Sequence, residues 1–247
     1  MGAPPEKTIL VTGSNGFVAG LIVKLALAKG YKVRGTVRSE SSGAKLKATF
    51  PEYAAQLSTT LVPDITVVED YEQALDVSIT EVIHCASPCS HHHLVNIRAE
   101  LLDPAIGGAV TILNVVQKYS RNVRRVVTTA SFASNLDVSK GLRGGYTYDE
   151  HDWNPMLYEE ASTASVAAAY SASKALAERA QCDCLRSRVR KEQAGLRSCS
   201  PFTRLAIWTH VRPVENLDHL SQSTSALWAL VDNEEIPSPD FMGFVNS

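Results

Sequence analysis

A glycine-rich turn near the start of the chain places the strongest constraint on its fold. Residues 8–12 read TILVT, a short β-branched apolar run, and residues 13–16 read GSNG. An apolar segment then extends from Phe17 to Lys29 and stops at Gly30. A strand, a tight turn and a helix in this order predict the opening unit of an α/β sheet.

Strand-like runs and helical segments continue to alternate after this unit. Strands are expected at 31–37, near 61–62, at 81–86 and at 125–129, and helices from about Ala44, at 71–75, over 94–119 and within 158–190. Strands joined through helices run parallel, with right-handed crossovers. They also lack regular alternation of apolar and polar residues, which is typical of a sheet with helices on both faces. The sequence therefore predicts an α/β protein with a doubly wound parallel sheet.

The composition fits one folded α/β domain plus a fraction of a second. The chain has 247 residues, of which 45% are hydrophobic and 20% are charged, as in ordinary globular proteins. The 24 basic and 26 acidic residues give a net charge of −2, which provides no general attraction to nucleic acid or to anionic membranes. No apolar run approaches the ~18 residues of a membrane span, and the first residues lack the apolar core of a signal peptide. We therefore expect a cytoplasmic protein whose five cysteines are free or buried thiols.

The turn at 13–16 has the glycine spacing of a dinucleotide-binding fingerprint. Gly13 permits the tight turn, and Gly16 lets the backbone approach a pyrophosphate. The N–H groups and the dipole at the start of the next helix then attract the phosphates. The residues expected to contact the cofactor here are Gly13, Ser14, Asn15, Gly16, Phe17 and Val18. The alternative is that the glycines end the strand for steric reasons alone.

The residue after the second strand bears on the choice between NAD and NADP. A carboxylate there binds the ribose 2′-hydroxyl of NAD, whereas an arginine suits the 2′-phosphate of NADP. Arg38 occupies this place, with Lys45 and Arg34 as secondary candidates, and its alternative role is that of a solvated surface arginine. The expected cofactor is therefore NADPH. Asp64, after the third strand, either accepts the adenine amino group or caps a turn.

A tyrosine and a lysine lie four residues apart on the alanine-rich helix. Tyr170 and Lys174 therefore share one helix face. A free phenol, with a pKa of ~10, exchanges protons poorly at neutral pH, and a nearby cation lowers that pKa. Tyr170 could then protonate an alkoxide formed by hydride transfer, while Ser131, after the fifth strand, could donate to the substrate carbonyl. The alternative is a solvated surface pair, the usual meaning of this spacing in isolation.

Taken in their order along the chain, these motifs resemble the extended short-chain dehydrogenase/reductase superfamily. The matching sequences are VTGSNGF at 11–17, GTVRS at 35–39, VPDI at 62–65, HCASP at 84–88, VVTTAS at 126–131 and YSASK at 170–174. Within the superfamily the chain is most similar to the dihydroflavonol reductase and cinnamoyl-CoA reductase group. It is also similar to the fungal relatives of that group, the methylglyoxal reductase-like aldehyde and ketone reductases.

The resemblance implies a Rossmann domain over 7–181 that reduces an aldehyde or ketone to an alcohol with NADPH. It implies catalytic roles for Ser131, Tyr170 and Lys174. The residues beside the cofactor would further include Asp64, Ile65, Ala86 and Ser87. The expected partner is a small carbonyl compound such as an intermediate of secondary metabolism. A homodimer could form through the helix from Leu94 and the helix that bears Tyr170.

The resemblance lapses over 182–210 and returns over 211–247. In the first segment basic residues stand where family members have a buried strand and a proline-rich turn. In the second, the similarity resumes as part of a substrate-binding region. This pattern resembles a local difference of reading frame or splicing, and it predicts an incomplete C-terminal substrate region.

Two other functions are compatible with these residues. One is a protein that binds the cofactor without turnover, because the lapse falls where the active site would be completed. The other is an NAD-dependent epimerase or dehydratase, which does not explain Arg38. No metal site is expected at 89–93, because adjacent histidines cannot all face one ion and no paired spacing accompanies them.

Overall fold

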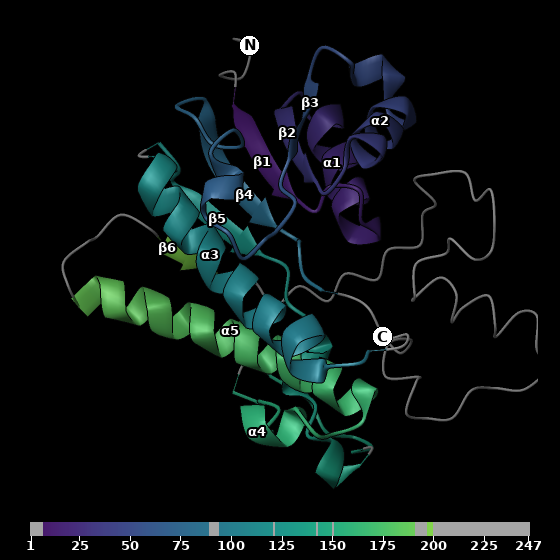
Figure 1. Ribbon diagram of the computed structural model, residues 1–247, viewed down its shortest axis with the longest axis vertical. Coiled ribbons are helices and arrows are strands. Elements are labelled where there is room, and N and C mark those ends of the chain that lie inside the picture. Colours follow the sequence, from purple (N-terminus) through teal and green to yellow (C-terminus); the bar gives the residue numbers. More distant parts are fainter. Residues whose placement is uncertain are drawn as a thin grey trace, which may run out of the picture. The chain divides into compact units, whose positions relative to one another are not determined.

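Strands and helices alternate along the residues that the structure, a computed structural model, describes: 7–88, 94–120, 122–141, 143–149, 151–190 and 197–199. The strands are β1 (Thr8–Thr12), β2 (Lys32–Val37), β3 (Leu57–Leu61), β4 (Ile79–His84), β5 (Arg125–Thr128) and β6 (Arg197–Cys199). The helices are α1 (Phe17–Ala28), α2 (Glu40–Thr49), α3 (Asp103–Tyr119), α4 (Tyr158–Ala161) and α5 (Val166–Arg190). All neighbouring strands run parallel, in the order β3-β2-β1-β4-β5-β6 (Figure 1). This order confirms the predicted doubly wound α/β fold.

The central strand β1 is buried on both faces of the sheet. Leu10 belongs to the same buried cluster as Val82 of β4, Val126 of β5, and Ile112 and Val116 of α3. Successive side chains of a strand point to opposite faces, so the residues on either side of Leu10 face the layer in which α1 and α2 contact β1, β2 and β3 (Figure 1). Helix α5 packs along α3. This two-sided burial explains why the strands show no regular polar alternation.

Two helices begin at places that differ from the prediction. Helix α2 begins at Glu40 rather than near Ala44, because the Ser39 hydroxyl accepts the N–H of Ser42 at 3.2 Å and caps the first turn. The helix expected from Leu94 begins later, with a π-helical turn over Arg98–Leu102 that leads into α3. Ser39 is thus a helix cap, and the apolar run from Leu94 is only in part helical.

The segment predicted to diverge from the family contributes to the sheet. Helix α5 continues through the expected boundary at residue 181 to Arg190. Strand β6 then pairs with β5, with Arg197 opposite Arg125, although no strand was expected within 182–210. The expected partial substrate-binding region at 211–247 lies outside the described residues.

Helix α3 and the turn before it are apolar enough, by length and composition, to cross a membrane. This corrects the expectation that no segment approaches that limit. Within the described fold, however, this segment supplies core: Ile112, Leu113, Val115 and Val116 are each at most 1% exposed and pack against the sheet. Burial against strands accounts for its apolar composition.

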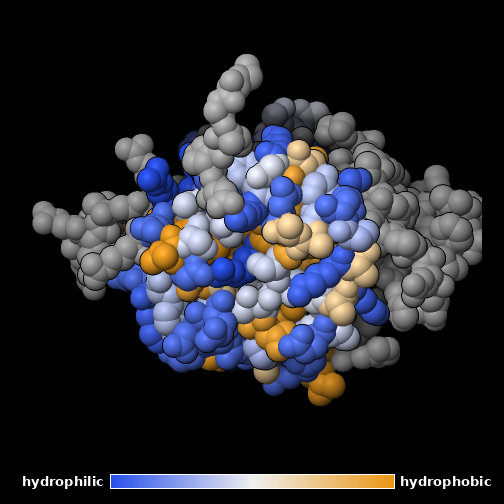
Figure 2. All heavy atoms as spheres, turned by 90° about the horizontal axis from the view of Figure 1, so that it is seen from above, coloured by the Kyte–Doolittle hydropathy of each residue, from blue (hydrophilic) through white to orange (hydrophobic). Residues whose placement is uncertain are grey.

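The outer surface mixes hydrophilic side chains with scattered apolar ones, as the face in Figure 2 shows. Val77, Val95 and Leu157 are exposed hydrophobic residues from three separate segments, an ordinary feature of globular proteins. Cys85, Cys182 and Cys184 are free thiols, as the sequence predicts. Burial raises the pKa of the Cys85 thiol to about 12, so this cysteine is a packing residue.

Gly35 of β2 packs closely against Ser14 of the glycine turn. A Cβ on Gly35 would overlap the Ser14 hydroxyl and lie 2.8 Å from Ser14 Cβ. Gly35→Ala should therefore destabilise the fold by about 1–3 kcal/mol, the usual cost of overpacking a core, as measured by chemical denaturation. Gly144→Ala is the control, because nothing lies within 4 Å of the added methyl group. Equal stability of the two variants would contradict this account of the packing.

Candidate active site

The glycine turn between β1 and α1 is held from two sides. Gly13 has a φ of 61°, a left-handed conformation that favours glycine. A Cβ on Gly13 would lie only 3.0 Å from the Cα of Ala86, which follows β4. On the other side, the Gly13 N–H donates to Thr36 Oγ1 of β2 at 3.1 Å. The turn thus lies between β2 and β4 at the carboxyl edge of the sheet, where parallel sheets bind ligands.

Ser14 anchors the turn and has no hydrogen free for a ligand. Its N–H and its hydroxyl both donate to the Thr36 carbonyl at 3.0 Å, and its side chain is fully buried. The absence of a side chain on Gly35 provides the space that Ser14 fills. Both polar hydrogens of Ser14 are thus engaged by β2, and a contact of Ser14 with the cofactor stays a prediction.

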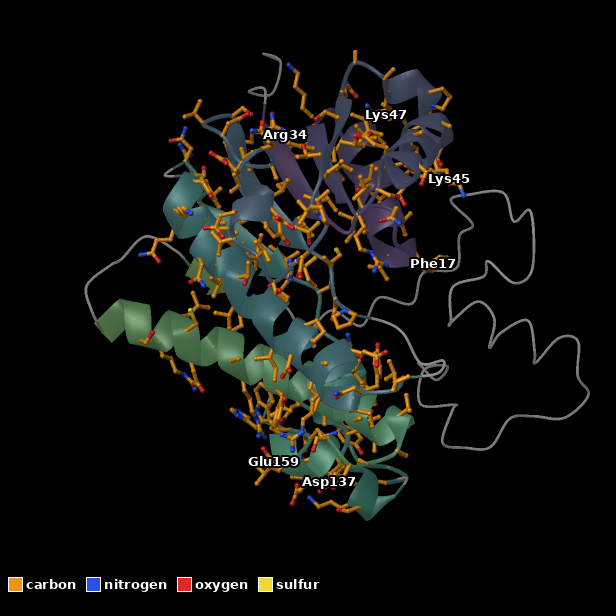
Figure 3. The ribbon with its side chains drawn as sticks, viewed as in Figure 1. Phe17, Arg34, Lys45, Lys47, Asp137 and Glu159 are labelled. Atoms are coloured by element: carbon orange, nitrogen blue, oxygen red, sulfur yellow. The ribbon has the colours of Figure 1, made fainter. Side chains whose placement is uncertain are left out.

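The start of α1 presents backbone donors at this edge. Gly16 is the N-cap and has no side chain with which to cap the helix, while its own N–H donates to Gly13 O at 2.8 Å. The first hydrogen bond of the helix runs from Gly20 N to Gly16 O. The N–H groups of Phe17 and Val18 precede it and have no acceptor within the helix. Such a helix start suits a phosphate; Asn15 completes the turn, and Figure 3 labels Phe17 at this end of α1.

Arg38 is exposed directly after β2, as the sequence predicts. Within the described part of the chain it has no hydrogen bond or ion pair, so its guanidinium is available to an anion. The side chain of Lys45 is likewise exposed on α2 (Figure 3). Arg34, the other candidate, is excluded: it pairs with Asp76 at 2.8 Å and donates to Ala74 O.

Asp64 adopts the turn-capping role that the sequence left open. Its Oδ1 accepts the N–H of Thr66 at 2.8 Å and the Thr66 hydroxyl at 2.7 Å. These hydrogen bonds hold the pKa of the carboxyl below its usual value. Ile65, the next residue, packs on α3, where a Cβ on Gly108 would approach its side chain to 2.7 Å. Both residues follow β3; contacts of Asp64 with adenine and of Ile65 with the cofactor stay proposals.

A buried hydrogen-bond centre, which sequence reasoning missed, joins β1 to the end of β4. Thr12 Oγ1 lies 3.0 Å from the N–H groups of both Cys85 and Ala86 and 2.9 Å from His84 Nδ1. The two N–H groups can only donate, so they occupy both lone pairs of the hydroxyl. The hydroxyl hydrogen must then go to His84 Nδ1, which makes His84 neutral with its proton on Nε2. The signal in the sequence was a threonine and a histidine that each end an apolar strand.

Burial and the charge of Lys174 favour the same neutral form of His84. They lower the pKa of the imidazole to about 4, with burial the larger cause. The ring is 2% exposed. His84 is therefore a fixed hydrogen-bond acceptor at neutral pH.

Helix α5 brings the predicted tyrosine and lysine together at this edge. Lys174 Nζ lies 4.7 Å from the centre of the Tyr170 ring. The same ammonium donates to Ser87 Oγ at 2.7 Å and to Pro88 O at 3.2 Å. Residues 85–88, which follow β4, thus connect the glycine turn to the lysine. A cation beside a phenol favours the phenolate, which is the arrangement that acid–base chemistry requires.

Ser131 lies beyond the end of β5, at the same edge. It is the N-cap of the short turn Phe132–Asn135 (η4), where its hydroxyl accepts the N–H of Ala133 at 3.2 Å. This turn packs against α5, and Ser134 Oγ lies 3.2 Å from Glu178 Oε2. The serine segment is therefore attached to the helix that carries Tyr170 and Lys174.

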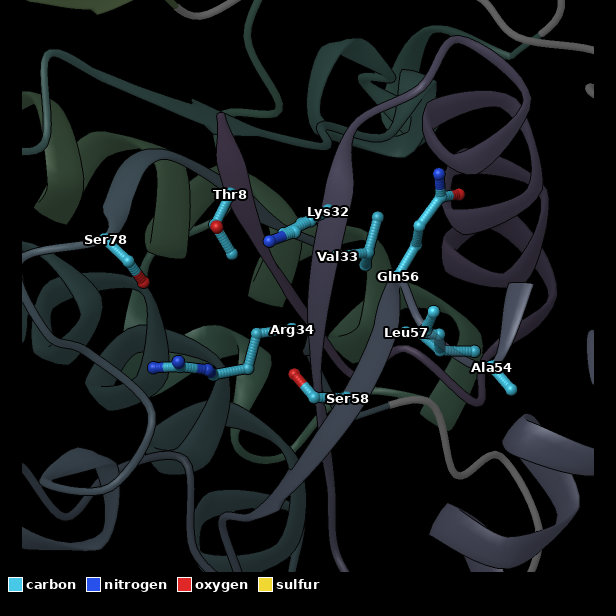
Figure 4. A pocket seen from close by; sticks show the side chains of 10 residues that line it. Thr8, Lys32, Val33, Arg34, Ala54, Gln56, Leu57, Ser58 and Ser78 are labelled. Carbon is cyan, nitrogen blue, oxygen red and sulfur yellow. The ribbon is translucent and has the colours of Figure 1, made fainter. Parts of the chain in front are cut away.

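A cavity lies at the opposite edge of the sheet. It has a volume of about 400 Å³ and is lined by the start of β1 and β2, including Thr8, Lys32 and Arg34 (Figure 4). Two of its polar side chains, Arg34 and Ser78, both bond to Asp76, whereas Gln56 Oε1 is buried without a hydrogen-bond partner among the described residues. The candidate site lies instead at the carboxyl edge of the sheet. Residues 89–93, where the sequence predicts no metal site, lie outside the described residues.

The neutral histidine predicts a pH dependence of stability. Because the folded pKa of His84, about 4, is below the unfolded value of about 6.5, the unfolded chain binds an extra proton between these pH values. Stability should therefore fall as the pH drops from 6.5 to 4, by up to about 1.4 kcal/mol per pH unit. The free energy of unfolding of wild type should fall more steeply over this range than that of His84→Asn. The control His151→Asn changes an exposed histidine and should keep the wild-type slope, whereas parallel slopes for all three proteins would contradict the assignment.

The chain is similar to known proteins in sequence. The family model described as NAD dependent epimerase/dehydratase family matches residues 9–187. An oxidoreductase of Schizosaccharomyces pombe is 31% identical, with 97% of this chain and 70% of that protein covered. The NADPH-dependent methylglyoxal reductase of Saccharomyces cerevisiae is 35% identical over 70% of this chain and 51% of its own length. A ketoreductase of Aspergillus niger is 34% identical over 72% and 52% of the two chains.

A solved structure agrees with the sequence matches. The crystal structure of the yeast methylglyoxal/isovaleraldehyde reductase complexed with NADPH has a TM-score of 0.72 and 31% identity, and the match covers 78% of this chain and 56% of that one. The chain thus spans about half the length of most of these relatives. The matched residues include β1 to β5 and most of α5. The chain belongs to the NAD dependent epimerase/dehydratase family.

Proposed function

We propose that this protein binds NADPH across the carboxyl edge of its sheet and reduces an aldehyde or ketone to an alcohol. The observation that carries the proposal is the ammonium of Lys174 beside the Tyr170 ring, at the edge that also holds the glycine turn and Arg38. The relatives whose names state an activity include reductases of aldehydes and of methylglyoxal and a ketoreductase. These names support the reaction class but not a particular substrate.

The residues present suit each part of the cofactor. The start of α1, with no side-chain cap, would hold the pyrophosphate through its N–H groups. Arg38, without a partner in the described chain, would bind the 2′-phosphate, supported by Lys45. Lys174, whose ammonium donates to Ser87 Oγ and Pro88 O, would bind the ribose hydroxyls beside the nicotinamide.

The chemistry divides between the cofactor and three side chains. When bound, NADPH supplies a hydride to the carbonyl carbon. Tyr170 donates its phenolic proton to the carbonyl oxygen, and Lys174 stabilises the phenolate that results. Ser131 donates a hydrogen bond to the same oxygen as negative charge develops on it.

Two alternatives have weaker support. An NAD-dependent epimerase or dehydratase would favour a carboxylate where this chain has Arg38. A protein that binds NADPH without turnover would have the described site but lack a substrate region, and residues 211–247 lie outside the described part of the chain.

We also propose a cytoplasmic location and a homodimer, with α3 and α5 as the elements to test, although these helices already pack on each other.

The cofactor preference is tested by the arginine after β2. Arg38→Ala should raise the dissociation constant for NADPH about 10- to 100-fold, because it removes charge-assisted hydrogen bonds to a phosphate. Binding of NADH, which lacks that phosphate, should hardly change. The measurement is titration of cofactor fluorescence, with Lys47→Ala on the exposed face of α2 as the control. Equal losses for both cofactors would argue against a 2′-phosphate contact.

The reaction is tested by the tyrosine on α5. Wild-type protein should oxidise NADPH in the presence of a panel of aldehydes and ketones. Tyr170→Phe should reduce the turnover number about 10²- to 10⁴-fold, the usual contribution of a general acid, with little effect on NADPH binding. Tyr53→Phe removes a phenol in the turn after α2 and serves as the matched control. NADPH binding by the wild type without oxidation of the cofactor, for any carbonyl, would favour the alternative without turnover.

A further inference from the structure

His84 connects the three segments that meet at the carboxyl edge of the sheet. Its Nδ1 accepts the Thr12 hydroxyl, next to the glycine turn. Its carbonyl oxygen accepts the N–H of Thr129 at 3.0 Å and the Thr129 hydroxyl at 3.3 Å, two residues before Ser131. The residues directly after it include Ser87 and Pro88, which bind the ammonium of Lys174. One buried residue is thereby bonded to Thr12 and Thr129 and directly precedes the segment that binds Lys174.

We propose that His84 is a positioning residue for Lys174, acting through the Thr12 hydroxyl and the four residues that follow β4. Its ring is the acceptor that the hydroxyl hydrogen requires, since the N–H groups of Cys85 and Ala86 occupy both lone pairs of Thr12 Oγ1. With that acceptor in place, the hydroxyl holds both N–H groups at 3.0 Å. The position of residues 85–88 then sets where the Lys174 ammonium lies relative to Tyr170.

Loss of the acceptor, His84 Nδ1, would change the position of Lys174. The Thr12 side chain is fully buried, so a hydrogen without an acceptor carries the full cost of desolvation. The hydroxyl would rotate toward another acceptor and weaken its bonds to Cys85 and Ala86. The end of β4 would then loosen where it also contacts Gly13, and Ser87 and Pro88 would hold Lys174 less firmly.

Two pairs of near-isosteric variants separate the hydrogen bond from simple packing. His84→Leu and His84→Asn leave similar space, but only the asparagine places an acceptor near the former Nδ1. Thr12→Val and Thr12→Ser differ in the same way, because only the serine retains a hydroxyl. Thr8→Val is the matched control at the other end of the same strand, where the threonine is 8% exposed.

Two measurements on the full 247-residue chain do not depend on turnover. Long-range ¹H–¹⁵N NMR should show His84 with an unprotonated Nδ1 and a protonated Nε2 at pH 7, assigned by loss of the signals in His84→Asn. Competitive acylation followed by mass spectrometry should show Lys174 about tenfold more reactive in His84→Leu and Thr12→Val. His84→Asn, Thr12→Ser and Thr8→Val should stay close to wild type.

A third measurement rests on the proposed function. The phenol must be protonated for reduction, so kcat/KM should fall at alkaline pH. If Lys174 is displaced, this alkaline limb should move up by about one pH unit in His84→Leu and Thr12→Val, and the conservative variants should restore it.

The outcomes separate the two proposals. A proton on Nδ1 of His84 would overturn the positioning role, and so would equal acylation of Lys174 in His84→Leu and His84→Asn. Absence of turnover in the wild type, together with the expected NMR and acylation results, would instead remove the proposed function and leave the positioning role supported.

Discussion

The hydroxyl of Thr12 is the point on which the rest of the candidate site depends. It has one hydrogen and two lone pairs, and all three are used within the protein: two N–H groups donate to it, and it donates to His84. A buried group with every hydrogen-bonding position filled has a single arrangement. The end of β4 is therefore held to the end of β1 through the N–H groups of Cys85 and Ala86.

The glycine turn, where the pyrophosphate is proposed to bind, is also closely packed. Gly35 has no side chain, so Ser14 can lie against β2 and give both of its polar hydrogens to Thr36. Gly13 has no side chain, so the turn can approach Ala86. The glycines therefore do more than permit a turn. They let the turn after β1 pack closely against β2 and against the residue after β4, next to the backbone donors of α1. A phosphate is the kind of group that such donors bind.

Helix α5 brings the tyrosine and lysine of the proposed acid–base chemistry to this edge. Its packing on α3 and on the turn after Ser131 carries Tyr170 and Lys174 across to β4, where Ser87 and Pro88 receive the ammonium. The segments involved are nearly 90 residues apart in the chain, and no local interaction could bring them together. The segment 182–210, where the sequence departs from the family pattern, begins within α5 and supplies β6.

The sequence by itself determined the doubly wound α/β class, the glycine turn, the exposed Arg38 and the pairing of Tyr170 with Lys174. Each depends on short-range features: the period of apolar residues, glycine conformation, or two positions one helical turn apart. Only the tertiary structure decided that Ser14 faces β2, that Arg34 pairs with Asp76, and that Thr12 forces His84 into one neutral tautomer. These facts depend on which polar groups of distant segments meet in a buried space, and hydrogen-bond partners there are set by the packing of strands and helices. The residue types alone do not specify these hydrogen-bond partners.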